Sequence, residues 1–402
     1  MTGDSRDYAN NSRRFIIFLL SSFIFSLGSS IITSIFPHFI LKLNIEMKLL
    51  GLIGTISSTL STALRVPFSA AMSSIGYFRT TCMSYTLVAL SRVFYSLANL
   101  SEHAIILFSV GYILSGIQFG LLRSARSSVI AYLTEKEKRG FSIGFTSSMM
   151  MMATSIGPFI GAIIYELSKD FTLVFLISLL VMILGSSVMF PLMRDDIKGL
   201  EDSERSFISQ MKFVPYVIKH GGLGKAFALF MIDAFVWSLT FRYVSIYLAS
   251  YLKAKPADLA QLNLVMTVVS VAGLISAGYV SDKLRRRVVF LVLSEICGIL
   301  YFTLVLIAKD LTLVYVAYAL MGFTISFWGP IASAYVTEKA EELSKDLIPM
   351  TVGVWGLLTS LSRMPGGVIG GFIYDINPHL LFETAAALLI VVTLLIALFL
   401  RD

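Results

Sequence analysis

Hydrophobic and polar positions follow each other in long blocks along this chain. Apolar runs of about 20 residues or more recur from end to end, which is the length a helix needs to cross about 30 Å of hydrocarbon. Short polar breaks separate them. The pattern predicts twelve membrane-spanning helices, over residues 15–40, 49–73, 80–99, 104–132, 140–165, 171–192, 225–252, 257–281, 288–308, 312–336, 348–374 and 378–400.

The first apolar run exceeds the 7 to 15 residues of a secretory signal and lacks a small-residue cleavage site, so we expect it to stay as a helix. A polar, mixed-charge stretch over residues 193–224 divides the runs into two sets of six. This division predicts a six-helix bundle over residues 1–192, a linker over 193–224 that serves as a tether, and a second six-helix bundle over 225–402.

Composition supports an integral membrane protein. Hydrophobic residues make up 56% of the chain and charged residues 14%, whereas charged residues make up about 25% of a typical soluble domain. Twenty of the Lys and Arg residues fall in the two terminal tails, the linker and the loops on the same side, and six fall in the opposite loops. Because cationic loops stay in the cytoplasm, we expect a multi-pass protein of the cell membrane with both termini cytoplasmic. This placement accounts for the net charge of +7 without nucleic acid.

Residues for catalysis or metal binding are sparse. The four His residues are scattered over loops and span ends, and Cys82 and Cys297 lie within predicted helices. Neither a zinc pattern nor a disulfide framework results. The glycines of the linker do not follow a strand, which argues against a phosphate-binding loop. We therefore expect no enzyme activity, no metal and no cofactor.

The two halves of the chain share sequence. The segment AYLTEKEK at Ala131 returns as AYVTEKAE at Ala334, and GPFIGAIIYE at Gly157 returns as GGVIGGFIYD at Gly366. These echoes indicate a duplicated six-helix unit in parallel orientation, the arrangement in which two halves rock about a site between them.

A charged stretch, GYVSDKLRRRVV, stands between two apolar runs of the second half. Its spacing resembles the G-x-x-x-D-R-x-G-R-R signature of the major facilitator superfamily, with Lys at the first Arg position and Arg285 at the second Gly position. The resemblance implies a latch on the cytoplasmic face, in which the Asp caps a helix and the Arg residues bridge helices. Plain anchoring by cations is the alternative. The residues that carry this resemblance are Gly278, Asp282, Lys283, Arg286 and Arg287.

The first half keeps little of this signature. Ser69 and Ser73 stand where its Gly and Asp would fall, and Gly76 is retained. We expect a missing or weak latch there, so that Asp282→Asn disturbs the conformational balance more than a change at Ser73.

A second resemblance lies in the predicted fifth helix. ATSIGPFIGA is similar to the antiporter motif G-x-x-x-G-P-x-x-G-G of the same family, keeping Gly157, Pro158 and Gly161 but carrying Ala at the outer glycines. Small residues also permit close helix packing, so antiport and packing alone both remain open.

Ionisable residues inside spans are costly and are usually functional or paired. Asp233 shares a helix face with Trp237 and Phe241, and the resemblance places this helix at the central cavity. The face is our first candidate for substrate binding or proton transfer, with helix packing as the alternative. Arg242 lies nine residues from Asp233, on the opposite side of an unbroken helix.

Other deep charges are mostly cationic. Arg65 follows Thr55, Ser58 and Thr62 on one polar face, and Arg92 and Arg363 are also deep. Their excess over Asp233 and Glu295 favours an anionic solute. Glu295 is a candidate to neutralise one of the arginines, although the resemblance places Glu295 and Arg92 on outer helices, which favours structural roles.

The family resemblance also predicts an Arg in the fourth helix, near Ser115, and this chain has none there. That departure argues against the common drug-and-proton exchange mechanism. Gln118, Trp328 and Trp355 complete the candidates for the cavity wall, with packing as the alternative for each tryptophan.

The sequence therefore predicts an all-α secondary transporter of the major facilitator type that works by alternating access. Proton-coupled efflux of a small organic solute is the leading interpretation. Uptake or exchange of an organic anion is the second, and a non-transporting membrane sensor is the third. The expected partners are a small-molecule substrate, a proton and the lipid bilayer, and we expect a monomer.

Overall fold

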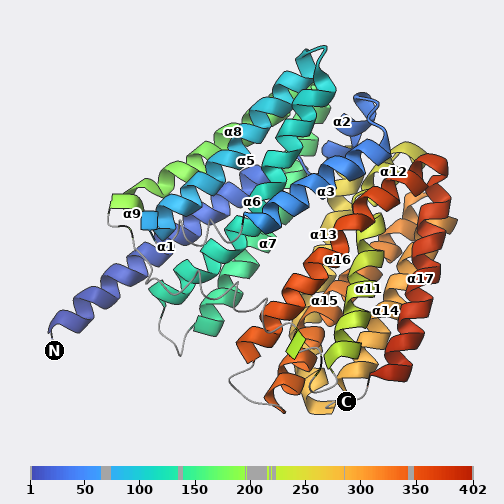
Figure 1. The fold of residues 1–402 in the computed structure, drawn as a ribbon. Coiled ribbons are helices and arrows are strands. Elements are labelled where there is room, and N and C mark those ends of the chain that lie inside the picture. Colours follow the sequence, from blue (N-terminus) through green and yellow to red (C-terminus); the bar gives the residue numbers. More distant parts are fainter. Residues whose placement is uncertain are drawn as a thin grey trace. The chain divides into compact units, whose positions relative to one another are not determined.

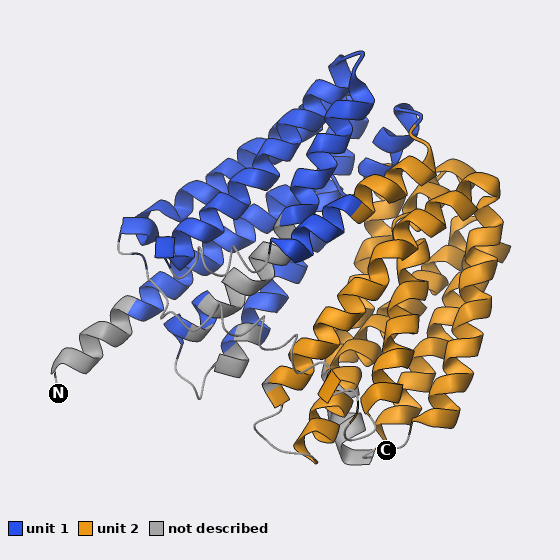
Figure 2. Cartoon of the chain, viewed as in Figure 1, with its two compact units in different colours: residues 1–44, 56–205 blue, residues 45–55, 206–402 orange. Residues whose placement is uncertain are grey.

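The computed structural model describes residues 2–64, 74–134, 139–194, 196, 215–216, 219, 223–284, 286–342 and 348–400, and all regular structure in these ranges is helical. The chain divides into two compact units (Figure 2). Unit 1 comprises residues 1–44 and 56–205, and unit 2 comprises residues 45–55 and 206–402. The grouping of residues 45–55 with the second unit was not anticipated, and the domain boundaries drawn from the sequence stay a prediction.

Unit 1 is built from antiparallel helices that follow the expected spans (Figure 1). Long helices run from one end of the unit to the other and short ones extend two of them. Their bounds are α1 (Thr2–Ser30), α2 (Phe36–Lys42), α3 (Met47–Ala63), α5 (Tyr77–Leu100), α6 (Ala104–Leu133), α7 (Arg139–Ser168), α8 (Phe171–Val188) and α9 (Phe190–Arg194), and the first residues of α3 are counted with unit 2.

Unit 2 repeats this plan. Within it α11 packs on α16 and α17, and α14 packs on α15 and α17. The bounds are α11 (Leu223–Thr240), α12 (Val244–Tyr251), α13 (Pro256–Leu284), α14 (Arg287–Ile307), α15 (Leu311–Glu341), α16 (Ile348–Ile376) and α17 (Pro378–Phe399). Each of the twelve expected spans contains a helix. Within the described ranges, eight helices are long and apolar enough to cross a membrane.

The first span of each unit is broken, where the sequence predicted continuous helices. In unit 1 the chain leaves α1 at Ser30 and resumes as α2 with Pro37 in its first turn, where the missing amide hydrogen of proline costs nothing. In unit 2 the break lies at residues 241–243, and the Tyr243 amide donates to the Thr240 carbonyl at 2.8 Å. Bonds between residues three apart are typical of tight turns at helix ends, and they keep the backbone of the break hydrogen-bonded.

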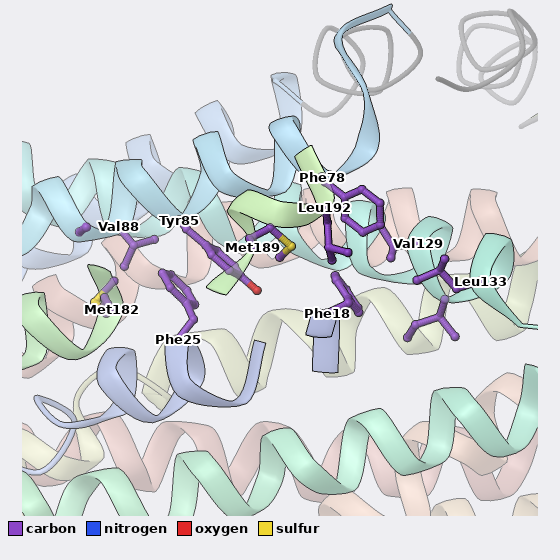
Figure 3. Close-up of a cluster of buried hydrophobic side chains, with 12 residues drawn as sticks. Phe18, Phe25, Phe78, Tyr85, Val88, Val129, Leu133, Met182, Met189 and Leu192 are labelled. Atoms are coloured by element: carbon purple, nitrogen blue, oxygen red, sulfur yellow. The ribbon is translucent and has the colours of Figure 1, made fainter. Parts of the chain in front are cut away.

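The core of unit 1 is a column of apolar side chains from α1, α5, α6, α8 and the segment that follows α8 (Figure 3). At its centre the rings of Phe25 and Tyr85 stack, with centroids 3.6 Å apart and planes 7° from parallel. The Tyr85 hydroxyl donates to Ser22 Oγ at 3.0 Å. An aromatic residue with a polar tip is thus buried with that tip satisfied.

The echoed glycine segments make the same contact in both units. A Cβ on Gly161 of α7 would overlap the carbonyl oxygen of Ile31, and one on Gly370 of α16 would overlap that of Leu239. Each glycine therefore brings its helix against the end of the first helix of its own unit, as small residues do in membranes. The Ser34 hydroxyl also donates to the Pro158 carbonyl at 2.7 Å. Close packing is thus one role of the motif, and its part in antiport stays a prediction.

Candidate functional site

Asp233 lies on α11 with only 2% of its surface exposed. Its Oδ1 atom has no hydrogen-bond donor among the described residues. Trp237, one turn further along the helix, lies beside the carboxyl group. Phe241 was expected on the same face, but it lies in the break that follows α11 and is 74% exposed. The acidic and aromatic face is therefore shorter than the sequence predicted.

Glu295 of α14 is the neighbour of Asp233. Its side chain is fully buried, and the two carboxyl groups lie next to each other, within hydrogen-bonding reach. Neither carboxylate oxygen of Glu295 has a donor among the described residues. The sequence suggested that Glu295 neutralises an arginine, and the structure instead turns it toward a second acid.

A cationic side chain accompanies this pair. Arg363 of α16 places its positive charge close enough to Asp233 to act on it. Its side chain is exposed, and no ion pair between Arg363 and either acid occurs in the described part of the chain. The pair is thus near a positive charge without being bound to it.

The wall beside the pair is aromatic. The Trp237 ring packs on the bare backbone of Gly298, where a Cβ would come within 2.7 Å of the ring. Its centroid lies 5.2 Å from that of Phe302 and 6.4 Å from that of Tyr301. The lack of a side chain at position 298 is what lets the indole approach α14 one turn from Glu295.

A second aromatic group lies one turn from Asp233 in the other direction. Phe230 of α11, 1% exposed, meets Trp328 edge-on at 5.4 Å, Trp355 at 6.2 Å and Tyr335 at 6.2 Å. The Trp355 Nε1 atom is buried without an acceptor among the described residues. Both tryptophans proposed for a cavity wall thus converge on one residue of the helix that carries Asp233.

Arg242 lies in the break after α11 and not on the face of Asp233. Its Nη2 donates to the Gly54 carbonyl at 3.1 Å, and a Cβ on Gly54 would come within 2.7 Å of the guanidinium carbon. Beside it the Tyr243 hydroxyl donates to the Gly367 carbonyl at 2.5 Å. Arg242 therefore binds backbone in the middle of α3.

The N-terminus of α3 is capped by a side chain of α16. The two carboxylate oxygens of Asp375 accept from the amides of Met47 and Lys48, at 3.0 Å and 2.8 Å. A carboxylate is favoured at a helix N-terminus because unpaired amides and the helix dipole are concentrated there. The neighbouring Glu46 forms an ion pair with Lys48 and raises the pKa of that lysine.

Arg92 is satisfied within unit 1. Its guanidinium donates to Ser178 Oγ at 3.1 Å, to Ser91 Oγ at 3.0 Å and to the Ser29 carbonyl at 3.0 Å. The side chain is 3% exposed. A buried guanidinium bonded to three oxygens holds helices together, which agrees with the structural role expected for Arg92. Ser115, where the family would place an arginine, bonds instead to the Tyr95 hydroxyl at 3.2 Å.

The charged signature of the second half is only partly described. Arg287 forms an ion pair with Glu338 of α15, with Nη2 to Oε1 at 2.7 Å, and Glu338 belongs to the echoed TEK segment. Arg286 precedes α14 and makes no side-chain cap. The backbone of Gly278, Asp282 and Lys283 is helical, but their side chains lie outside the described residues.

Asp196 of the linker caps α5, the helix that follows the degraded first signature in the sequence. Its two oxygens accept from the amides of Phe78 and Arg79 at 2.9 Å and 2.8 Å, in the first turn of α5. Gly76 precedes that turn with φ of 118°, and a Cβ there would overlap the Asp196 carboxylate. The sequence carried a signal for this contact in the retained Gly76 and the acidic start of the linker, yet the linker was interpreted as a tether alone.

Four other positions singled out in the sequence fall outside the structural description. Arg65, Ser69 and Ser73 lie outside the described residues, and Gln118 lies on α6 with its side chain outside them.

Comparison with known proteins places the chain in a family. The family model of the Major Facilitator Superfamily matches residues 18–346 and 226–402. The chain belongs to the major facilitator superfamily. It is therefore an all-α membrane transport protein and not an enzyme, as the signature and the twelve apolar runs predicted.

Among curated relatives within the superfamily, the Multidrug resistance protein 2 of Bacillus subtilis (strain 168) is 22% identical over 387 residues, 94% of this chain and 92% of the relative. The Quinolone resistance protein NorA of Staphylococcus aureus (strain COL) is 17% identical over 373 residues, 91% of each chain.

Solved structures share the major facilitator fold. The nucleoside transporter NupG superposes with a TM-score of 0.74 at 12% identity, over 97% of this chain and 99% of that one. A POT family transporter in complex with 5-aminolevulinic acid gives a TM-score of 0.72 at 13% identity, over 97% and 96%. At this identity the likeness concerns the fold alone.

Proposed function

We propose that this member of the superfamily exports small organic compounds by alternating access, in exchange for protons. We place it in the cell membrane with both termini in the cytoplasm, following the distribution of Lys and Arg. The relatives named for multidrug and quinolone resistance support export and suggest the first compounds to test.

The observation that carries the proposal is the burial of Asp233. An acid that is 2% exposed and lacks a donor for Oδ1 within the described residues is costly in a membrane helix unless it has a function. A carboxyl group can gain and lose a proton as its access to water changes, and coupled transport requires such a group. Arg242 does not neutralise it, since that side chain binds the Gly54 carbonyl.

Trp328 and Trp355, which pack around the buried Phe230, supply the surface that we propose for the solute. Aromatic faces bind flat apolar molecules through large contact areas, and pockets for small molecules combine such faces with a few polar groups. The Trp355 Nε1 atom is buried without an acceptor among the described residues, so it is available to donate to a carbonyl or carboxylate of the solute.

Transport of an organic anion is the second candidate, and Arg363 is the observation in its favour. This cation is exposed and lies near Asp233. The wider excess of arginines gives less support than the sequence suggested, because Arg92 bonds to serine oxygens and backbone.

The test uses purified protein in proteoliposomes with an imposed pH gradient. A panel of a quinolone, a planar cationic dye and an aromatic carboxylate is offered to the wild type and to Asp233→Asn. We expect the wild type to accumulate the quinolone or the dye in the lumen against its gradient when the lumen is acidic, because protons that leave the lumen down their gradient drive the compound inward. We expect Asp233→Asn to lose this accumulation by at least tenfold while counterflow exchange continues.

Asp258→Asn is the matched control, since Asp258 caps the first turn of α13 through the Lys255 amide, away from this face. Unchanged accumulation in Asp233→Asn contradicts coupling through that residue. If only the carboxylate accumulates, and Arg363→Gln abolishes this accumulation, we conclude that the protein transports organic anions and does not export uncharged or cationic compounds.

A further inference from the structure

We infer that Asp233 and Glu295 act as one site that holds a single shared proton, and that this is the proton exchanged for the solute. The inference rests on the proposed function and adds Glu295, a residue of a helix that the family plan places outside the cavity. It deepens the proposal by stating where the proton sits and why transport requires it.

Two neighbouring helices bring the acids together away from water. Asp233 is 2% exposed and Glu295 fully buried, and their carboxyl groups lie within hydrogen-bonding reach of each other. Three of the four carboxyl oxygens, Asp233 Oδ1 and both Oε atoms of Glu295, are buried and have no donor among the described residues. The missing donor is what a proton between the two groups would supply.

Electrostatics decides against two ionised acids in this arrangement. Two negative charges in contact repel strongly in a low dielectric, and each buried ion without a donor adds several kcal/mol of desolvation, on the order of magnitude usual for buried charges. One proton removes the repulsion and creates a short, charge-assisted hydrogen bond between carboxyl and carboxylate. Like-charged acids that share a site titrate as a pair in this way.

Among the described residues around the pair, none is a base that could take the proton. Arg363 of α16 contributes a positive charge, which balances the single negative charge of the protonated pair. Tyr301 of α14 and Tyr318 of α15 face each other edge-on at 5.9 Å. On α17 the titratable residues are Glu383, which is exposed, and His379, which contacts Tyr247.

The shared proton links protonation to conformation. The helices can adopt the buried arrangement only when the proton is present, because the doubly ionised pair needs water or further cations. Opening the pair to water lets the proton leave a carboxyl O–H for a water molecule, and both carboxylates are then hydrated. The unprotonated pair changes sides only while a bound solute shields it, and after the solute leaves it takes up a proton from that side and is buried again. One proton therefore crosses in exchange for the solute in each cycle.

Infrared spectroscopy of the purified protein tests the sharing without any substrate. We expect a band of a protonated, strongly hydrogen-bonded carboxyl group at neutral pH that disappears in both Asp233→Asn and Glu295→Gln, because the shared bond needs both acids. Glu383→Gln, the same change at an exposed position of unit 2, should keep it. Absence of the band in the wild type, or its survival in Glu295→Gln, overturns the inference.

Proteoliposome transport tests the coupling. Glu295→Gln should retain counterflow exchange within about twofold and lose accumulation driven by the pH gradient by at least tenfold, because a carboxylate beside an amide donor can be buried without a proton. Full proton-driven accumulation in Glu295→Gln, with loss in Asp233→Asn, refutes the shared site and leaves the proposed function intact. If a pH gradient never drives accumulation by the wild type, the proposed function and the coupling are both refuted. The infrared experiment then still shows whether Asp233 and Glu295 share a proton.

A thermal melt in detergent checks that each variant is folded. Gln and Asn keep the size of the acids and add an N–H donor, so the melting temperature should not fall by more than a few degrees. If Glu295→Gln does unfold, survival of the infrared band in Asp233→Asn still overturns the sharing, and Glu295→Asp, which keeps an acid at this position, replaces it as the second variant: a shifted band supports the sharing and an unchanged band contradicts it.

Discussion

Arg287 and Glu338 tie α14 to α15 through two donors of one guanidinium, with Nη2 at 2.7 Å and Nε at 3.2 Å from the same Oε1 atom. The first residue belongs to the charged signature of the second half and the second to the echoed TEK segment. Two motifs found separately in the sequence therefore meet in one ion pair.

Removing this pair should destabilise unit 2 modestly. Glu338 is 51% exposed at its side chain and Arg287 12%, so water screens the attraction and we expect Glu338→Gln to cost about 1 kcal/mol or less. The melting temperature in detergent at low and high salt measures it, and the difference from the wild type should shrink as salt rises. Glu342→Gln is the matched control, since Glu342 pairs with Lys339 on its own helix. Equal effects from both changes would contradict a specific tie between α14 and α15.

Asp196 should stabilise unit 1 more than its place in a linker suggests. Asp196→Asn keeps one acceptor but removes the charge that faces the first turn of α5, and Asp196→Ala removes both bonds. We expect Asp196→Ala to cost about 1 to 2 kcal/mol, the usual range for loss of a helix cap, and Asp196→Asn less. Hydrogen exchange of the Phe78 and Arg79 amides reports the cap directly.

The control for the cap is Ser73→Ala, at the position where the family signature would carry its acid. Protection of the Phe78 and Arg79 amides should be lost in Asp196→Ala and kept in Ser73→Ala. If Ser73→Ala exposes them equally, Asp196 has not taken over the capping role.

The two glycines at matching positions in the repeat should respond alike to a methyl group. Gly161→Ala and Gly370→Ala place a Cβ on the carbonyl oxygens of Ile31 and Leu239, and backbone cannot give way as a side chain can. We expect each to cost about 1 to 3 kcal/mol, as overpacking does. Melting temperature and retention of counterflow are the measurements.

Gly144→Ala and Gly356→Ala are the controls for this comparison, one in each unit, because a Cβ at either position meets nothing within 4 Å. Alanine also favours a helix over glycine by about 1 kcal/mol, so these variants should be as stable as the wild type or more so. If the controls lose as much stability as Gly161→Ala, the effect of Gly161→Ala does not come from the close contact between α7 and the end of α1.

The two buried acids differ in how much of their role could be predicted from the sequence. Asp233 was singled out because a lone acid in an apolar run is conspicuous without any structure. Glu295 was equally visible, but its partner was assigned as an arginine because opposite charges usually pair. Which face of α14 turns to α11 depends on the absence of a side chain at Gly298, where the Trp237 ring packs, and the sequence pattern does not report such a contact.

The breaks at residues 31–35 and 241–243 were missed for a related reason. Both lie inside runs whose average hydropathy is that of a continuous span, although Arg242 stands in the second. Hydropathy measures transfer into lipid and not the continuity of a helix. The second break has no proline to mark it, and it occurs where Arg242 turns to the backbone at Gly54.

The membrane class, the positions of the spans, the repeat and the family could all be read from the chain alone, because each depends on local composition or on the spacing of residues. Tertiary structure decided that Asp233 faces Glu295, that Asp196 caps α5 and that Arg242 and Arg92 bind oxygens of the protein. These contacts join residues far apart in the chain, and they depend on how each helix is rotated about its axis, which is set by close packing of side chains against the neighbouring helices.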